Sequence, residues 1–173
     1  MKKSLFVCTL AIFILGLFVS SGLADDTLAR FRGGIGVHPV SNVVAGDPVV
    51  VNRNVVRGVN PAGQLWEIAD LDARVETNGD ITVRGKGLIL AGGNNAGRAT
   101  GQNVFATLIC EAPPGPFTER NTNPVGVPLA ANGDFKIDDV LTPLPDGDCA
   151  SPMLLIRNAD GQAWFAVGIP ELK

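Results

Sequence analysis

The sequence predicts an all-β fold: a single-domain, two-sheet antiparallel β-sandwich, immunoglobulin-like or jelly-roll-like, with one disulfide. Three observations predict it. Glycine and proline are frequent, with 21 Gly and 12 Pro in 173 residues, and such punctuation leaves little room for long helices. Short runs rich in Val, Ile, Leu and Phe lie between the turns. The segment 69–76 alternates strictly between apolar and polar residues, which is typical of a half-buried strand.

The first 24 residues have the three-part layout of a secretory signal peptide. Two lysines precede an apolar run over 5–19, and the small residues Gly22 and Ala24 stand three and one positions before the expected cut. The run is short for a membrane-spanning helix, although an uncleaved N-terminal anchor is the alternative. We therefore predict a signal peptide over 1–24 and one domain over 25–173, exported to the periplasm or to the exterior of the cell.

The charge of the exported part limits its partners. Without Lys2 and Lys3 it carries 12 basic and 17 acidic residues, a net charge of −5, and the acidic residues are scattered. This composition argues against nucleic acid and against an anionic membrane as partners. Beyond the signal no second apolar run is long enough to span a bilayer, so we expect the partner to be an unidentified ligand or a protein of the cell envelope.

Two cysteines remain after the signal, Cys110 and Cys149. An exported protein meets an oxidising compartment, so the pair predicts a disulfide. Two buried free thiols are the alternative. A metal site is disfavoured because no further soft ligands lie nearby.

The expected strands follow one another along the whole exported chain. In chain order they are 34–40, 48–51, 69–76, 87–91, 103–110, 152–157 and 163–169. The rival for 69–76 is a helix that begins at Asn60-Pro61, ends at Gly79 and carries an apolar stripe from Leu65 to Val75.

The tripeptide Asn-Gly-Asp occurs twice, at 78–80 and at 132–134. Asn-Gly between two alternating runs is a strong hairpin signal because both residues tolerate positive φ. A three-residue loop over 78–80 sets Val75 opposite Val83 and keeps the apolar face continuous. The repeated tripeptide is therefore interpreted as a scaffold device and not as a chemical site.

Two segments are predicted to be irregular, 92–102, which is rich in Gly and Asn, and 111–126, which is rich in Pro. Long loops on a rigid β scaffold are frequent binding sites. We expect these two to be the contact surfaces of the protein; the alternative is that they are accumulated insertions without a function.

Few residues offer nucleophilic or imidazole chemistry. His38 is the only histidine, which excludes copper and zinc sites built on several imidazoles. Beyond the signal the only serines are Ser41 and Ser151, and the spacing of Ser41 from His38 places the two side chains on opposite faces of a strand. We interpret His38 as a partly exposed strand residue.

Asp70, Asp72 and Glu76 are the candidate catalytic residues. They share one face of a strand, where neighbours at i and i+2 lie roughly 7 Å apart, within the range of carboxylate pairs in glycosidases. The chain has no tyrosine and two tryptophans, few for a sugar platform. A solvated acidic face interleaved with Arg74 is the preferred interpretation.

No cofactor and no metal are predicted. The segment 145–149 and the two Asn-Gly-Asp turns supply hard oxygen ligands, but none completes a twelve-residue calcium loop, so a weak structural calcium site is only an alternative. The sequence thus predicts an exported, non-catalytic binding or structural protein of the cell envelope or exterior. The alternatives are a secreted hydrolase that uses the Asp70, Asp72 and Glu76 face, and an assembly subunit that pairs strands with its neighbours.

Overall fold

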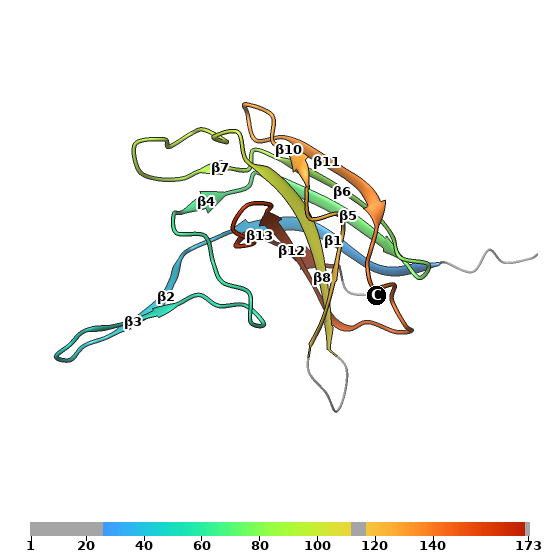
Figure 1. The fold of residues 1–173 in the computed structure, drawn as a ribbon, viewed down its shortest axis with the longest axis horizontal. Helices are drawn as coiled ribbons and strands as arrows, with labels where there is room; N and C mark the ends of the chain where they lie inside the picture. Colours follow the sequence, from blue (N-terminus) through green and yellow to red (C-terminus); the bar gives the residue numbers. More distant parts are fainter. Residues whose placement is uncertain (1–25, 112–116, 172–173) are drawn as a thin grey trace, which may run out of the picture.

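The structure is a computed structural model that describes residues 26–111 and 117–171. The predicted signal peptide over 1–24 lies outside the described residues. The described residues form thirteen strands and no helix (Figure 1). The strands are β1 (Thr27–Gly36), β2 (Val40–Val44), β3 (Val50–Arg53), β4 (Trp66–Glu67), β5 (Asp70–Glu76), β6 (Asp80–Lys86), β7 (Ile89–Leu90), β8 (Asn103–Glu111), β9 (Thr118–Asn121), β10 (Val127–Pro128), β11 (Phe135–Val140), β12 (Ala150–Asn158) and β13 (Trp164–Pro170).

These strands confirm the all-β prediction. The rival helix over 60–79 is wrong, because Trp66–Glu67 and Asp70–Glu76 are strands and Leu71, Ala73 and Val75 are buried on one face of the second, as alternation requires. No helix long and apolar enough to cross a bilayer occurs in the described part of the chain.

Nine strands form one antiparallel sheet in the order β10-β8-β12-β13-β1-β5-β6-β11, with β9 also paired to β8. The sheet is strongly curled (Figure 1). Its two ends meet where Asn121 of β9 and Thr142, just after β11, exchange backbone hydrogen bonds of 2.9 and 2.8 Å. The inner face of this one curled sheet takes the place of the two facing layers of the predicted sandwich, and Phe31, Leu71 and Leu154 are almost completely buried in the core.

Two short sheets stand apart from the curled sheet, β2 with β3 and β4 with β7. The β4–β7 pair is packed on the main body, because Trp66 stacks on Phe165 of β13 with ring centroids 4.0 Å apart. The nearby bridge between Pro61 and Trp164 fixes the chain that leads into β4. The β2–β3 pair has no such cover.

In the β5–β6 hairpin the apolar residues lie on one face, as predicted, but the two strands are paired in a different register. Val75 lies opposite Ile81, so the expected pairing of Val75 with Val83 is wrong by two residues. The loop covers 77–79 and not 78–80, which leaves Asp80 as the first residue of β6. A shift of two residues keeps every side chain on its face, and for this reason the apolar face is still continuous.

Both Asn-Gly-Asp turns are built in the same way. Asn78 Oδ1 accepts a hydrogen bond of 2.9 Å from the Asp80 N–H, and Asn132 Oδ1 accepts one of 3.2 Å from the Asp134 N–H. In return each Asn side-chain amide donates to the Asp carboxylate, at 2.8 and 2.9 Å. Local side-chain bonds of this kind specify a turn. The repeated tripeptide therefore has a structural role: it specifies the backbone conformation of two turns.

We expect Asn78→Ala and Asn132→Ala each to lower the free energy of unfolding by about 1 kcal/mol, because each removes one accepted and one donated turn hydrogen bond. Urea denaturation measures the change. The exposed Asn94 of the 92–102 loop supplies the control, and Asn94→Ala should leave the midpoint unchanged within error. Equal effects at all three positions would contradict the role of the turns.

The segment 111–126 is less irregular than predicted. Within it, Thr118–Asn121 forms β9, which pairs with β8 in antiparallel register from Thr107↔Asn121 to Cys110↔Thr118. Residues 112–116 lie outside the described residues. The segment 92–102 has no strand, as expected for an irregular loop.

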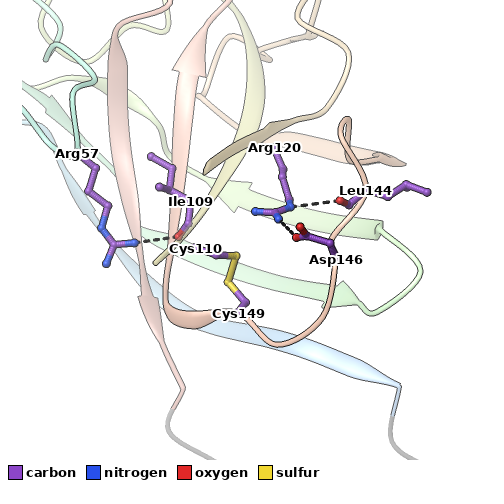
Figure 2. Close-up of a disulfide and its surroundings, with 7 residues drawn as sticks. All are labelled: Arg57, Ile109, Cys110, Arg120, Leu144, Asp146 and Cys149. Carbon is purple, nitrogen blue, oxygen red and sulfur yellow. Dashed lines mark hydrogen bonds and ion pairs between the residues drawn. A yellow bond between two sulfur atoms is a disulfide. The ribbon is translucent and has the colours of Figure 1, made fainter. Parts of the chain in front are cut away.

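The predicted disulfide is confirmed. Cys110 at the end of β8 is bonded to Cys149 just before β12, with a Cα–Cα distance of 5.0 Å (Figure 2). It therefore joins two neighbouring strands of the curled sheet across 39 residues of sequence.

Candidate functional site

The most exposed part of the structure is the β2–β3 hairpin, residues 40–53, called the arm below. Figure 1 shows it projecting from the body, away from the curled sheet. Every residue of the arm is exposed. In the described chain β2 and β3 pair only with each other, so the outer edge of each strand carries unpaired backbone N–H and C=O groups.

The arm is apolar as well as exposed. Val43 lies opposite Val51 and Val44 lies opposite Val50, and alternation places these two pairs on opposite faces of the hairpin. The exposed fractions of its valines range from 43% at Val40 to 60% at Val49. An isolated two-stranded hairpin is marginally stable in water, and a contiguous apolar surface is typical of an interaction site.

The base of the arm is fixed to the body by hydrogen bonds. Arg53 Nη2 donates to the Pro61 carbonyl at 3.0 Å, and Asn54 Nδ2 donates to the His38 carbonyl at 3.0 Å. The indole N–H of Trp164 donates to the Asn54 carbonyl at 3.1 Å. Trp164 is itself buried in the core. The arm therefore leaves the body in a defined direction.

A second surface is an apolar groove of about 1340 Å³ along β1, β12 and β13. The large aliphatic side chains and the methionine in its lining are Leu28, Ile35, Met153, Val167 and Ile169. Ile35 and Ile169 are 55% and 44% exposed, although they belong to central strands of the sheet. We call this surface the apolar groove.

The direction of the groove residues follows from the pairing of β1 with β13. Gly34 lies opposite Gly168, and a Cβ at either position would approach Leu71, a core residue, within 3.2–3.3 Å. The adjacent pair, Ile35 and Val167, points to the other face by alternation. Ile35 and Val167 therefore line the apolar groove from the side of β1 and β13 that is turned away from Leu71, whereas Leu28 at the other end of β1 lines the groove and also belongs to the buried core.

Four charged residues lie around the apolar groove: Arg30, Arg57, Asp148 and Glu171. Arg57 is held in place, since its Nη1 donates to the Ile109 carbonyl at 2.9 Å (Figure 2) and its guanidinium lies 4.6 Å from the centroid of the Phe117 ring. Arg30 is exposed.

Two arginines are buried, and each forms an ion pair that could not be predicted from the sequence. Arg120 of β9 pairs with Asp146 and donates to the Leu144 carbonyl at 3.4 Å (Figure 2). Arg157 of β12 donates to Glu119 at 2.7 Å. The partners are 26 and 38 residues apart, so no local spacing could have revealed them. Both pairs tie β9 to the body and have a structural role.

The predicted catalytic residues lie on an exposed strand face. Asp70 is opposite Lys86 and Asp72 is opposite Arg84 in the β5–β6 ladder. Asp72 also lies 4.0 Å from Arg32, and Glu76 lies 3.4 Å from Arg74. None of the three carboxylates lines the apolar groove or the two smaller cavities, of about 290 and 230 Å³. The preferred prediction of a solvated acidic face, and the alternative that these carboxylates are catalytic, both stay predictions.

A carboxylate with a perturbed proton affinity lies further along the same exposed face. The Lys136 ammonium, followed by the Thr82 hydroxyl, lowers the pKa of Asp138 by hydrogen bonding to its carboxylate. Lys136 and Asp138 are neighbours on β11 and are both exposed. This is a surface ion pair of small energetic weight.

His38 does not lie in a strand, so its interpretation as a partly exposed strand residue is wrong; it is an exposed residue of the link between β1 and β2. Ser41 Oγ donates to the Asn52 carbonyl within the arm, whereas Ser151 lines the apolar groove. Among the hydrogen bonds of the described residues, none joins the His38 side chain to either serine.

The prediction that the 92–102 and 111–126 loops are contact surfaces stays a prediction. Asn95, Thr100 and Gln102 of the 92–102 loop line the cavity of about 290 Å³ beside Trp66. Asp146 of the 145–149 segment is paired with Arg120. Within residues 26–111 and 117–171, no group of three or more His, Cys, Asp or Glu side chains is arranged to hold a metal ion.

Sequence reasoning missed both the arm and the apolar groove. The valines of the arm have the pattern of an ordinary strand, and the groove is assembled from five separate parts of the chain.

Comparisons with known protein families, with curated proteins and with solved structures find no match to this chain.

Proposed function

We propose that this chain is an exported, non-catalytic structural or binding protein that holds a protein partner through its arm. The observation that carries the proposal is the arm itself: an exposed, valine-rich hairpin with two free edges, held away from the body by hydrogen bonds at its base. The signal-like segment over 1–24 and the Cys110–Cys149 disulfide support export to an oxidising compartment.

A protein partner suits the arm better than a small ligand does. An unpaired strand edge offers a row of backbone donors and acceptors, which another chain can extend as an added strand while side-chain pockets receive the valines. Asp47 and Arg53 are the only charged residues of the arm, and its Pro48 and the register shift between Val40 and Asn42 lie at its turn and its base, so the valine strands themselves have unprotected edges. This favours the strand-pairing role over the hydrolase alternative.

Photo-crosslinking in the producing cells tests the proposal. A photoreactive residue at position 50, in the arm, should give a discrete covalent product with another polypeptide. The same residue at position 125 should give none, because Val125 is 69% exposed but lies outside the arm. The double substitution Val43→Asp and Val51→Asp should abolish the product from position 50, although Val50 lies on the opposite face of the hairpin, since two charges in the arm oppose its desolvation on a partner. If the photoreactive residue at position 50 is incorporated and illuminated but no covalent product with another polypeptide forms, the proposal is overturned.

A further inference from the structure

We propose that the partner is a second copy of this chain, whose apolar groove receives the arm. The inference rests on the proposed function and makes it specific. Each copy would then offer two surfaces, an arm and an apolar groove, and the assembly would be head-to-tail. Contacts of this heterologous kind generate rings or open filaments.

The lengths of the two surfaces agree. The arm extends from Val40 to its turn at Gly46, which at the rise of a strand is about 20 Å. The apolar groove follows β1 from Thr27 to Ile35, which at the same rise is about 26 Å. An inserted arm could therefore lie along the groove over its full length.

The chemistry of the two surfaces also agrees. The valines of the arm would be placed against Ile35, Met153, Val167 and Ile169, so that apolar surface on both copies leaves water. The only carboxylate of the arm is Asp47 in its turn, and the groove carries two arginines, Arg30 and Arg57, and two carboxylates, Asp148 and Glu171, so an inserted arm would place Asp47 beside an arginine and away from the carboxylates. Opposite charges at the rim of an interface fix its orientation.

The arm does not fill the groove of its own chain. Its direction is set by the hydrogen bonds from Arg53 to the Pro61 carbonyl and from the Trp164 indole to the Asn54 carbonyl, and it points away from the curled sheet (Figure 1). Folding it back onto β1 would break these bonds. Another copy is the nearest chain that presents the complementary groove.

The contact is small. It joins the 14 residues of the arm to the 17 residues that line the groove, fewer on each side than the roughly 20–30 of a standard interface. We therefore expect reversible assembly with a dissociation constant on the order of micromolar.

The test is a complementation experiment by analytical ultracentrifugation. The arm variant carries Val43→Asp and Val51→Asp, and the groove variant carries Ile35→Asp and Ile169→Asp. All four positions are more than 40% exposed, and the control Val125→Asp makes the same change at an exposed valine elsewhere. Circular dichroism and thermal unfolding must match those of the control. If the groove variant fails to fold, Ile35→Asp alone replaces it.

Wild-type protein and the control should assemble as concentration rises, with the arm and groove variants remaining monomeric. An equimolar mixture of the two variants should form a one-to-one dimer and nothing larger, because only one intact arm and one intact groove are present. This result is specific to an arm in a groove.

The other outcomes separate the two proposals. If the groove variant assembles as wild type does but the arm variant does not, arms pair with arms; the inference fails and the proposed function stands. If wild type remains monomeric at every concentration, the second-copy inference fails. The proposed function is then tested separately, by crosslinking from position 50. If the arm variant assembles as wild type does, the inference fails, and the proposed function stands only if crosslinking from position 50 still finds a partner. Binding to lipid vesicles by wild type and not by the arm variant would assign the arm to a membrane and overturn both.

Discussion

Replacing Cys110 and Cys149 with serine should lower the free energy of unfolding by about 4 kcal/mol. The bond closes a loop of 39 residues, and the chain-entropy model of cross-linking gives this magnitude for a loop of that length. In a domain of this size such a loss corresponds to a fall in melting temperature of about 10 °C. This loss of unfolding free energy is one of the two largest that we expect from the substitutions proposed for this chain.

We expect a large effect on the free energy of unfolding because few other contacts constrain the segment before β12. From Thr142 to Asp148 the chain forms no strand, and most of its residues are exposed. Thr142 is held by its two backbone hydrogen bonds to Asn121, and Arg120 donates to the Leu144 carbonyl and pairs with Asp146 (Figure 2). Asp146 is 88% exposed, so solvent screens this pair. Cys149 also lines the apolar groove, so loss of the bond should loosen that surface as well.

Urea denaturation of the oxidised protein, the reduced protein and the double serine variant provides the measurement. The reduced protein and the serine variant should share one midpoint, well below that of the oxidised protein. If reduction leaves the midpoint unchanged, the loop is constrained by other contacts and the entropic argument fails. If the serine variant is much less stable than the reduced protein, the loss comes from packing of the sulfur atoms and not from the cross-link.

The parts of the fold that sequence could predict are those fixed by local chemistry. Strict alternation over 69–76 identified β5, and the two cysteines that follow the predicted signal peptide identified the disulfide. The register of β5 with β6 was missed because it depends on which residue begins the second strand. The Asn78 side chain bonds the Asp80 N–H and so places Asp80 in the strand, a detail that parity cannot reveal.

The exposure of the arm could not be predicted for a different reason. Its apolar run has the pattern of a buried strand, and burial depends on whether the rest of the chain covers it. Here the curled sheet closes through Asn121 and Thr142 without using β2 or β3. The pattern rule therefore found only part of the arm, since the predicted strand 48–51 overlaps β3 whereas β2 was not predicted, and it gave no sign that the arm is exposed. Residues at odds with their environment are expected at functional sites.

Gly133→Ala should be the most damaging glycine substitution within the two Asn-Gly-Asp turns, lowering the free energy of unfolding by about 3 kcal/mol. Gly133 has φ of +83°, which alanine adopts at a cost of about 1–2 kcal/mol. A Cβ there would also lie 2.5 Å from the backbone nitrogen and oxygen of Leu88. The Leu88 N–H donates to the Gly133 carbonyl at 3.0 Å, so the two backbones cannot separate without losing this bond.

Gly79 of the first turn provides the matched comparison, since it has φ of +93° in the same tripeptide. The nearest atom to its Cβ would be the Leu144 side-chain terminus at 2.7 Å, and Leu144 is 57% exposed and free to move. Gly58, with φ of +86° and nothing within 4 Å of a Cβ, isolates the backbone cost alone. Urea denaturation should therefore rank the losses as Gly133→Ala well above Gly79→Ala, and Gly79→Ala equal to or slightly above Gly58→Ala. If all three losses are equal, positive φ accounts for the whole requirement for glycine. A distinct excess at Gly133 shows that the close approach of the second turn to Leu88 holds the β10–β11 corner against the body.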